Sequence, residues 1–253
     1  MSETVVGKQP VRELLRAGRR VHRILVASGA RETSNLREIL ELAARRHVPV
    51  QPVARARLDQ LADHHQGVVA ETEPYPYTDF RALLAAARAS DRPPLYLALD
   101  LVQDPQNFGT LLRTAAAVGV SGVLLPEHRA VGVTPGVRRA SAGAVEHLRI
   151  ARVPNLARAL EQLKEAGVWV VGLDARAPQA YDTLDPRGPL AIVVGSEEQG
   201  LRRLVREVCD FLVALPMEPV IDSLNAAVAG SIVLYSYYRA RQCATTTATE
   251  SPR

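Results

Sequence analysis

The chain has 253 residues, of which 47% are hydrophobic and 23% are charged, and its formal net charge is +4. This length and composition predict a globular protein of one large or two small domains, and no apolar run approaches the roughly 20 residues of a membrane span. The two cysteines, Cys209 and Cys243, lack the number and spacing of a disulfide framework or a metal site. Because the first residues also lack a secretory signal, we expect a reduced, cytoplasmic protein without a metal.

The first 75 residues alternate helical and extended patterns, which predicts a small α/β domain. Residues 11–18 form a short amphipathic helix that ends at a glycine, and residues 34–47 form a longer helix with Ser34 as its expected cap. This part of the chain holds twelve Lys or Arg against nine Asp or Glu. The excess suits contact with RNA phosphates, although an arginine-rich genome composition explains it as readily.

Residues 94–243 repeat a strand, loop and helix rhythm, which predicts a second, larger α/β domain. Five short apolar runs have the form of strands buried in a parallel sheet: residues 95–101, 122–125, 168–173, 190–194 and 211–215. The helices between these runs are expected to cover the sheet. Prolines at both ends of residues 76–93 predict a linker that carries a short helix, and residues 244–253 are expected to be a disordered tail.

Ligands of open parallel sheets bind at the carboxyl ends of the strands, so polar residues that follow strands are candidate site residues. After the first strand of this domain, Asn107 and Gly109 lead into a helix in which Arg113 lies among apolar residues. Asn107 is readily explained as the helix cap and Gly109 as a turn residue. An arginine surrounded by apolar neighbours near the strand ends is less easily explained, and Arg113 is therefore a candidate functional residue.

A second candidate segment is a loop in which Gly195 and Gly200 flank Glu197. Glycines at such a place let backbone amides approach a ligand, although an ordinary turn between a strand and a helix has the same pattern. A third segment precedes the last long helix, where Ser223 and Asn225 follow a strand. Asp222 or Ser223 is the expected cap of that helix, so capping explains these residues as well as function does.

Several other kinds of site are excluded or disfavoured by their motifs. The chain has neither the dinucleotide-binding nor the phosphate-loop glycine pattern, and it lacks the nucleophile elbow of the hydrolases. His64 and His65 are adjacent, but no second ligand pair accompanies them, which argues against a metal site.

Taken together and in this order, the three segments resemble the three motifs of the SpoU/TrmH family of RNA 2′-O-methyltransferases, within the SPOUT superfamily. The resemblance covers about residues 95–241. The matching residues are Asn107, Gly109 and Arg113 in the first motif, Gly195, Glu197 and Gly200 in the second, and Pro216, Ser223, Leu224 and Asn225 in the third. The opening VVGKQPVRELLRAG and the later HHQGVVA resemble the family's L30e-like substrate-binding domain.

The resemblance implies an α/β architecture of two domains. Residues 1–75 would be the small L30e-like RNA-binding domain, and residues 94–243 would be the SPOUT methyltransferase domain, with a mostly parallel sheet and a trefoil knot near its C-terminal end. It also implies a homodimer formed through the C-terminal domain, with the last helix at its interface.

The resemblance further implies S-adenosylmethionine as the cofactor and no metal. The implied cofactor-binding residues are Gly195, Gly200, Leu215, Leu224 and Asn225, and the implied catalytic residues are Asn107, Arg113, Glu197, Ser223 and Asn225. The two-domain arrangement is most similar to bacterial 23S rRNA guanosine-2′-O-methyltransferases.

Three alternative functions stay open at this stage. The same chemistry on a tRNA guanosine is one, and a non-catalytic RNA-binding protein of ribosome assembly with the same fold is another. An unrelated nucleotide-binding α/β enzyme is the third, and the missing phosphate-loop motifs argue against it.

Overall fold

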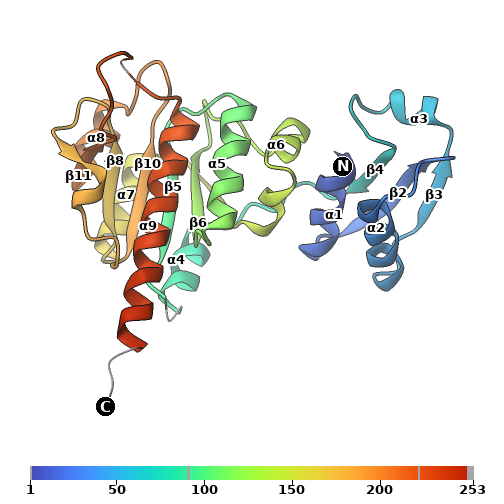
Figure 1. Cartoon of the computed structure of the whole chain (residues 1–253), viewed down its shortest axis with the longest axis horizontal. Helices are drawn as coiled ribbons and strands as arrows, with labels where there is room; N and C mark the ends of the chain where they lie inside the picture. Colours follow the sequence, from blue (N-terminus) through green and yellow to red (C-terminus); the bar gives the residue numbers. More distant parts are fainter. Residues whose placement is uncertain (1, 90–91, 222, 250–253) are drawn as a thin grey trace. The chain divides into compact units, whose positions relative to one another are not determined.

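The computed structural model describes residues 2–89, 92–221 and 223–249, and the chain folds into two compact units. The N-terminal unit comprises residues 1–76 and 132–147, and the C-terminal unit comprises residues 77–131 and 148–253. Figure 1 shows the elements of each unit. Within the described ranges, no helix is both long and apolar enough to cross a membrane.

The N-terminal unit is built on a four-stranded sheet of order β1-β4-β2-β3, in which only β2 and β3 run parallel. Its elements are β1 (Glu3–Val6), α1 (Lys8–Arg16), β2 (Val21–Ala27), α2 (Ser34–Arg45), β3 (Val50–Val53), α3 (Arg55–Asp59), β4 (Val68–Thr72), α6 (Pro135–Ala140) and the 3-10 helix η1 (Ala144–His147). Helices α1 and α2 pack on each other and bury their apolar faces against the sheet. The cap expected at Ser34 is wrong, because Thr33 has the extended backbone of a cap and its Oγ1 accepts a hydrogen bond from Leu36 N at 3.3 Å.

Residues 132–147 come from the middle of the expected second domain, yet they fold with the N-terminal unit. Helix α6 packs on β1, and η1 packs on α1. Gly143 makes this packing possible, because its φ of +83° favours glycine and a Cβ there would lie 2.9 Å from the Cα of Pro10. The expected division of the chain into residues 1–75 and 94–243 placed residues 132–147 in the second domain. In the structure, the chain returns to the N-terminal unit over these residues.

A buried ionic cluster holds residues 132–147 in place. The Glu146 side chain is 1% exposed, and it pairs with Arg138 and Arg19, each at 3.3 Å. Arg138, itself 2% exposed, also pairs with Glu3 at 3.1 Å. Burial raises the pKa of Glu146, although the two arginines act in the opposite direction. A buried charge that loses its partner is strongly destabilising, so this cluster ties two distant parts of the sequence together.

Replacement of Glu146 by alanine is expected to lower the free energy of unfolding by about 3 kcal/mol or more, because it leaves the buried Arg138 guanidinium without its main counter-charge. Urea denaturation followed by circular dichroism measures the loss. The matched control is Glu73→Ala, which breaks an exposed ion pair with Arg20 and should cost less than about 1 kcal/mol. Equal losses in the two variants would contradict the role given to the cluster.

The C-terminal unit is built on a seven-stranded sheet of order β7-β6-β5-β10-β8-β11-β9, and every neighbouring pair in it is parallel. Its elements are α4 (Phe80–Arg88), β5 (Leu95–Leu99), α5 (Pro105–Ala117), β6 (Gly122–Pro126), β7 (Ile150–Val153), α7 (Leu156–Glu165), β8 (Trp169–Leu173), β9 (Gln179–Ala180), the 3-10 helix η2 (Tyr181–Thr183), β10 (Leu190–Val194), α8 (Arg203–Val208), β11 (Phe211–Ala214) and α9 (Ala226–Thr249). The five predicted strands are confirmed. The sequence pattern missed β7 and β9, because both are short and β7 includes the exposed Arg152.

Helices cover both faces of this sheet. The core under α4, α7 and α8 is one cluster of buried side chains, while α5 and α9 lie side by side on the other face (Figure 1). Gly230 allows α9 to approach closely, because a Cβ there would lie 2.7 Å from Leu111 and 2.9 Å from Val194. The expected linker 76–93 contains α4, whose Leu83 is buried against Gly122.

The last helix differs from its expected limits at both ends. Helix α9 runs to Thr249, so residues 244–249 are helical rather than part of a disordered tail, while residues 250–253 lie outside the described part of the chain. No glycine or proline interrupts residues 231–249, and a helix that has started propagates easily. Helix α8 precedes β11 and packs with α7, whereas α9 follows β11 and packs with α5.

Candidate active site

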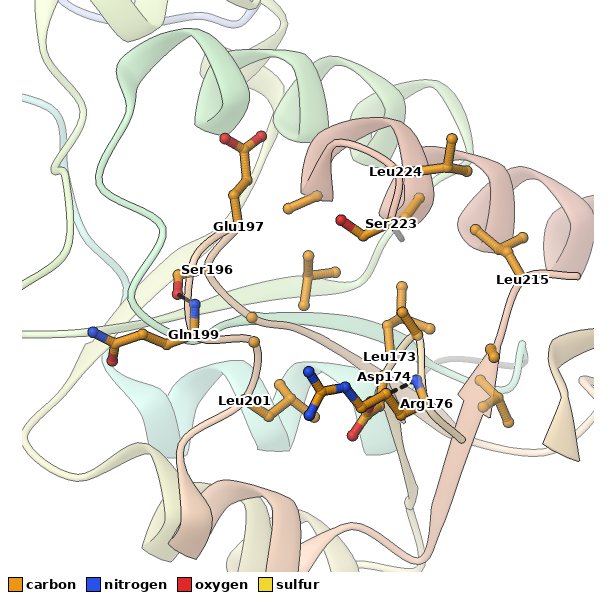
Figure 2. A pocket seen from close by; sticks show the side chains of 18 of the residues that line it. Leu173, Asp174, Arg176, Ser196, Glu197, Gln199, Leu201, Leu215, Ser223 and Leu224 are labelled. Atoms are coloured by element: carbon orange, nitrogen blue, oxygen red, sulfur yellow. Dashed lines mark hydrogen bonds between the residues drawn. The ribbon is translucent and has the colours of Figure 1, made fainter. Parts of the chain in front are cut away.

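The carboxyl ends of β5, β8, β10 and β11 meet at one edge of the parallel sheet, as expected for a ligand site. The loops that follow β8, β10 and β11 surround a cavity of about 510 Å³ (Figure 2). Four of the five predicted cofactor-binding residues line it: Gly195, Gly200, Leu215 and Leu224. Ser223 lines it as well, whereas Asn225 is not among the described residues of its wall.

The loop of residues 195–202 forms the centre of the site. Gly195 permits the loop to fold back, because a Cβ there would lie 2.6 Å from the nitrogen of Leu201 and closer still to the carbonyl of Gly200. Ser196 and Gly200 exchange two backbone hydrogen bonds, of 3.1 and 2.9 Å, and Gly200 has a φ of +65°. Both motif glycines are therefore required by the backbone at this point.

An ion pair between a buried aspartate and an arginine that is partly exposed fixes this loop to the neighbouring strand. Asp100 follows β5, is fully buried, and accepts hydrogen bonds from the Arg202 backbone nitrogen at 2.8 Å and from Arg202 Nε at 2.7 Å. The next residue, Leu101, has a φ of +62°, a conformation that costs a branched side chain about 1–3 kcal/mol. Sequence reasoning missed both partners. The available signal was the position of Asp100 directly after five apolar residues, because a buried carboxylate needs a partner.

Three predicted catalytic residues meet in one hydrogen-bonded network. Asn107 Nδ2 donates to Glu197 Oε1 at 2.9 Å, and Asn225 Nδ2 donates to Asn107 Oδ1 at 3.0 Å and also to Glu197 Oε1. These residues lie up to 118 positions apart in the sequence. One carboxylate oxygen of Glu197 thus accepts from two side-chain amides, which orients the carboxylate at the rim of the cavity.

Helix capping explains why the two amides point as they do. The cap of α5 is Asp104, whose Oδ2 accepts from Asn107 N at 2.9 Å, so the expectation that Asn107 is the cap is wrong. Asn225 caps α9 through its Oδ1, which accepts from the backbone nitrogens of Ala227 and Val228 at 3.0 and 3.1 Å. This oxygen contact leaves the amide nitrogen of Asn225 facing the network.

The expected cap at Asp222 or Ser223 is therefore also corrected: α9 begins after Asn225, and Asp222 lies outside the described residues.

Arg113 stands apart from this network within one chain. It is exposed, and it has no hydrogen bond or ion pair with any described residue. Six residues at about 100° each place it on a different face of α5 from Asn107. Thr114, one position on, does share the Asn107 face, and its Oγ1 lies 2.9 Å from Ser231 Oγ on α9.

A second, smaller hollow of about 220 Å³ lies on the other side of the glycine loop. Its lining includes Gln103, Asp104 and Asn107, and it shares residues 195–199 and Ala226 with the large cavity. The loop that carries Glu197 thus separates the two spaces.

Two further groups near the cavity were not predicted from the sequence. Asp174 follows β8 and lines the cavity, where it pairs with Arg206 and accepts from Arg176 N at 2.9 Å (Figure 2). Cys209 lies below this edge, against Gly172. Burial, reinforced by the neighbouring Asp210 carboxylate, raises the pKa of Cys209 to about 12, so its thiol stays protonated and does not serve as a nucleophile.

Comparison with known proteins identifies the family. Residues 94–235 match the SpoU rRNA Methylase family, and residues 4–78 match the RNA 2′-O ribose methyltransferase substrate binding family. The chain belongs to the SpoU methylase family. It is 44% identical to the TrmH family tRNA/rRNA methyltransferase YacO of Bacillus subtilis, over 94% of this chain and 95% of that protein.

Solved structures show the same fold. The SpoU methyltransferase AviRb of Streptomyces viridochromogenes, in complex with AdoMet, has a TM-score of 0.79 at 26% identity and covers 96% of this chain and 91% of its own. The AdoMet-bound rRNA methyltransferase of Sinorhizobium meliloti has a TM-score of 0.76 at 27% identity and covers 94% and 87%. The predicted SPOUT architecture, with a small α/β domain before a mostly parallel sheet, is confirmed.

Membership of this family makes the protein an RNA 2′-O-methyltransferase that uses S-adenosylmethionine. The large cavity fits that cofactor in size, because small-molecule sites span about 300–1,000 Å³. Apolar side chains such as Leu173, Leu201 and Met217 line the cavity and would hold the apolar parts of the cofactor, and the close backbone at Gly195 would bring main-chain atoms to it. The bound cofactor supplies a methyl group already activated on a sulfonium.

Replacement of Gly195 by alanine is expected to abolish binding of S-adenosylmethionine, because the added Cβ overlaps the Gly200 backbone and the loop cannot close. Isothermal titration calorimetry measures the affinity. Gly188→Ala is the matched control, since a Cβ at Gly188 meets nothing within 4 Å. An affinity of G195A within about twofold of the control would show that the loop geometry does not form the cofactor site.

Proposed function

We propose that this methyltransferase acts on the ribose 2′-hydroxyl of a guanosine in 23S rRNA, as a cytoplasmic homodimer. The observation that supports the choice of rRNA is the likeness to the S. meliloti rRNA methyltransferase over 94% of this chain, a range that includes the RNA substrate-binding match at residues 4–78. A ribosomal substrate places the enzyme in the cytoplasm.

A tRNA guanosine is the second candidate substrate. The relative YacO carries a name that covers both tRNA and rRNA, so identity at this level favours neither.

The network at the rim of the cavity supplies the proposed positioning of the substrate ribose. Glu197 is held by two amides, so it accepts hydrogen bonds in a fixed direction with little cost of reorganisation. We assign Asn107, Glu197, Ser223 and Asn225 to the orientation of the ribose and of the arginine that acts on it. Gly195, Gly200, Leu215 and Leu224 hold the cofactor, and Asn225 supports them through the first turn of α9.

Arg113 is assigned to charge stabilisation. A guanidinium gives up its proton only at strongly alkaline pH, which makes arginine a poor proton acceptor. Its fixed positive charge instead stabilises the alkoxide that develops on the ribose 2′-oxygen, and its fork of donors binds the adjacent phosphate. The exposed guanidinium of Arg113 is free to meet RNA in this way.

The proposed dimer accounts for the separation of Arg113 from the network. Helix α9 exposes three large apolar side chains at helical spacing: Val228, Ile232 and Tyr235, which are 45%, 38% and 55% exposed. A stripe with this spacing is the usual face of a helix-to-helix interface. Helix α5, which carries Arg113, packs beside α9. A second copy seated on this stripe would bring Arg113 close to a catalytic edge.

The function is tested with radiolabelled S-adenosylmethionine and the purified protein. Total tRNA and 23S rRNA from a strain that lacks the gene are offered separately, and the labelled nucleoside is identified. The expected product is 2′-O-methylguanosine in 23S rRNA, and the Arg113→Ala variant is expected to lose about 100-fold or more of the rate, as the loss of one charge-stabilising group does. Label on tRNA alone would identify a tRNA guanosine, the second candidate, as the substrate.

Two further outcomes of this assay contradict the proposal. Measurable cofactor binding without transfer to either RNA would favour a non-catalytic RNA-binding protein. Near-complete turnover by Arg113→Lys, with an unchanged pH dependence, would remove the specific role of the guanidinium, because lysine lacks the planar fork of donors.

The Ile232→Glu, Tyr235→Glu double variant is expected to be a monomer by size-exclusion chromatography with light scattering, because it places two charges in the proposed interface. The rate of methyl transfer should fall as well, because the proposed active site needs Arg113 from the second copy. Val220→Glu is the control, since Val220 is 85% exposed but lies outside the α9 stripe. A wild-type protein that is itself monomeric at the assay concentration would rule out the dimer.

A further inference from the structure

We propose that one end of the N-terminal unit binds the RNA, through phosphate contacts and one stacked base. This face, called the strand-end face, is formed by Lys8, Arg31, Arg55, Arg57 and His64. The proposal rests on the proposed function in one respect, that the substrate is RNA. It adds the surface and the chemistry by which that RNA is held.

The five residues gather at one end of the sheet because four chain segments meet there. Lys8 follows β1, Arg31 follows β2, and Arg55 follows β3, while His64 precedes β4, which runs antiparallel to β1 and β2. Hydrogen bonds between these segments confirm the grouping. Lys8 Nζ donates to Thr33 Oγ1 at 3.3 Å, and Lys8 N donates to Gln66 Oε1 at 3.3 Å. Ser28 N also donates to Val53 O at 2.7 Å.

The strand-end face differs from the rest of the unit in its charge pairing. Elsewhere, most of the exposed or half-buried arginines pair with glutamates: the pairs are Arg12 with Glu13 and Glu38, Arg16 with Glu38, Arg20 with Glu73, Arg23 with Glu71, Arg37 with Glu32 and Arg45 with Glu41. Of the others, Arg46 donates to the backbone carbonyls of Leu15 and Arg19, and the exposed Arg139 on α6 pairs with no carboxylate of the described residues. Arg31, Arg55 and Arg57 are exposed, and none of them pairs with a carboxylate of the described residues. Arg57 donates only to the neutral Gln60, at 3.3 Å. Exposed cations that no carboxylate neutralises, gathered on one face, are the footprint of phosphate binding.

The loop of residues 62–67 adds a strained and rigid element to this face. His64, Gln66 and Gly67 all have left-handed backbone, with φ of 58°, 51° and 83°. Two non-glycine residues in this conformation cost free energy, and such strain gathers at functional sites.

Hydrogen bonds hold the loop in that shape. His65 is 4% exposed, and its Nδ1 accepts from Gly67 N at 2.9 Å. The proton of its ring therefore lies on Nε2, which donates to Asp59 Oδ1 at 2.8 Å. Gln66 is held by Lys8 N. His64 is thus left as an exposed imidazole on a fixed loop, which is a platform for stacking on an unpaired base.

The residues around this face favour RNA over an acidic protein as the partner. Protein interfaces place large apolar side chains at their centre. The exposed large apolar residues described in this unit, Leu40 and Val50, lie on α2 and at the opposite end of β3. The nearby carboxylates are Glu32, which pairs with Arg37, Asp59, which bonds the His65 ring, and Asp63, which has no cation partner among the described residues. A surface that combines exposed arginines with one exposed aromatic ring, that of His64, and has no apolar centre is typical of nucleic-acid binding.

The test compares two triple variants of the full chain that lose the same charge. R31Q/R55Q/R57Q removes the unpaired cations, and R20Q/R23Q/R45Q removes cations that glutamates already neutralise. Affinity for unmodified 23S rRNA, transcribed in vitro, is measured by filter binding over a series of KCl concentrations. We expect the first variant to reduce the slope of log affinity against log salt by about 2, as the loss of three phosphate contacts does. The second variant should retain the wild-type slope.

The stacking part is tested with His64→Asn, because asparagine adopts left-handed backbone readily and so adds no strain. Its affinity for the same RNA is expected to fall about tenfold with the salt slope unchanged, and His64→Tyr, which keeps a ring, should retain most of the affinity. Equal slopes and affinities in wild type and R31Q/R55Q/R57Q would overturn the strand-end face as the RNA site and leave it to another partner, such as an acidic protein.

Methyl transfer separates failure of this proposal from failure of the proposed function. At saturating 23S rRNA, R31Q/R55Q/R57Q should transfer the methyl group at the wild-type maximal rate, since none of its changes lies in the catalytic unit. If the wild-type protein binds and methylates 23S rRNA and the three substitutions leave its affinity unchanged, only the RNA-binding role of the strand-end face is refuted. A wild-type protein that methylates no RNA refutes the proposed function itself.

Discussion

The backward fold of residues 195–202 is the constraint on which the catalytic edge depends. It exists because Gly195 has no side chain, and it stays closed because the buried Asp100 holds Arg202 from the end of β5. Once the loop is closed, Glu197 is held at the rim of the large cavity, within reach of Asn107 and Asn225. Both the cofactor cavity and the smaller hollow take their shared wall from this loop.

The amides of the network show how secondary structure can orient a functional group. Asn225 uses its oxygen to cap α9, so its nitrogen has one remaining direction, toward Asn107 and Glu197. Asp104 caps α5, which releases the Asn107 side chain from that task. A helix start thus serves as a support for the site in both cases, and the support is rigid because each helix packs on the same face of the sheet.

Much of the fold and the identity of the site segments could be predicted from the sequence, for reasons that are local. Apolar runs of five residues marked the central strands, and glycines marked the loop at 195–200. The cap of α5 was assigned to Asn107 rather than Asp104, because both residue types are good caps and lie close together. The Asp100–Arg202 pair spans 102 positions and the return of residues 132–147 depends on Arg138 and Glu146, so no local pattern could reveal either. The position of Arg113 outside the network likewise depends on the helix phase rather than on its neighbours in sequence.

The return of residues 132–147 has a consequence for modularity. The chain passes from one unit to the other three times, after residues 76, 131 and 147, so the N-terminal unit is discontinuous in sequence. A gene segment that ends near residue 76 encodes an incomplete module, with Glu3 and Arg19 deprived of the charges that Arg138 and Glu146 provide. Recombination that exchanges substrate-binding modules between relatives must therefore carry two separate pieces of coding sequence, and the pieces must be inherited together.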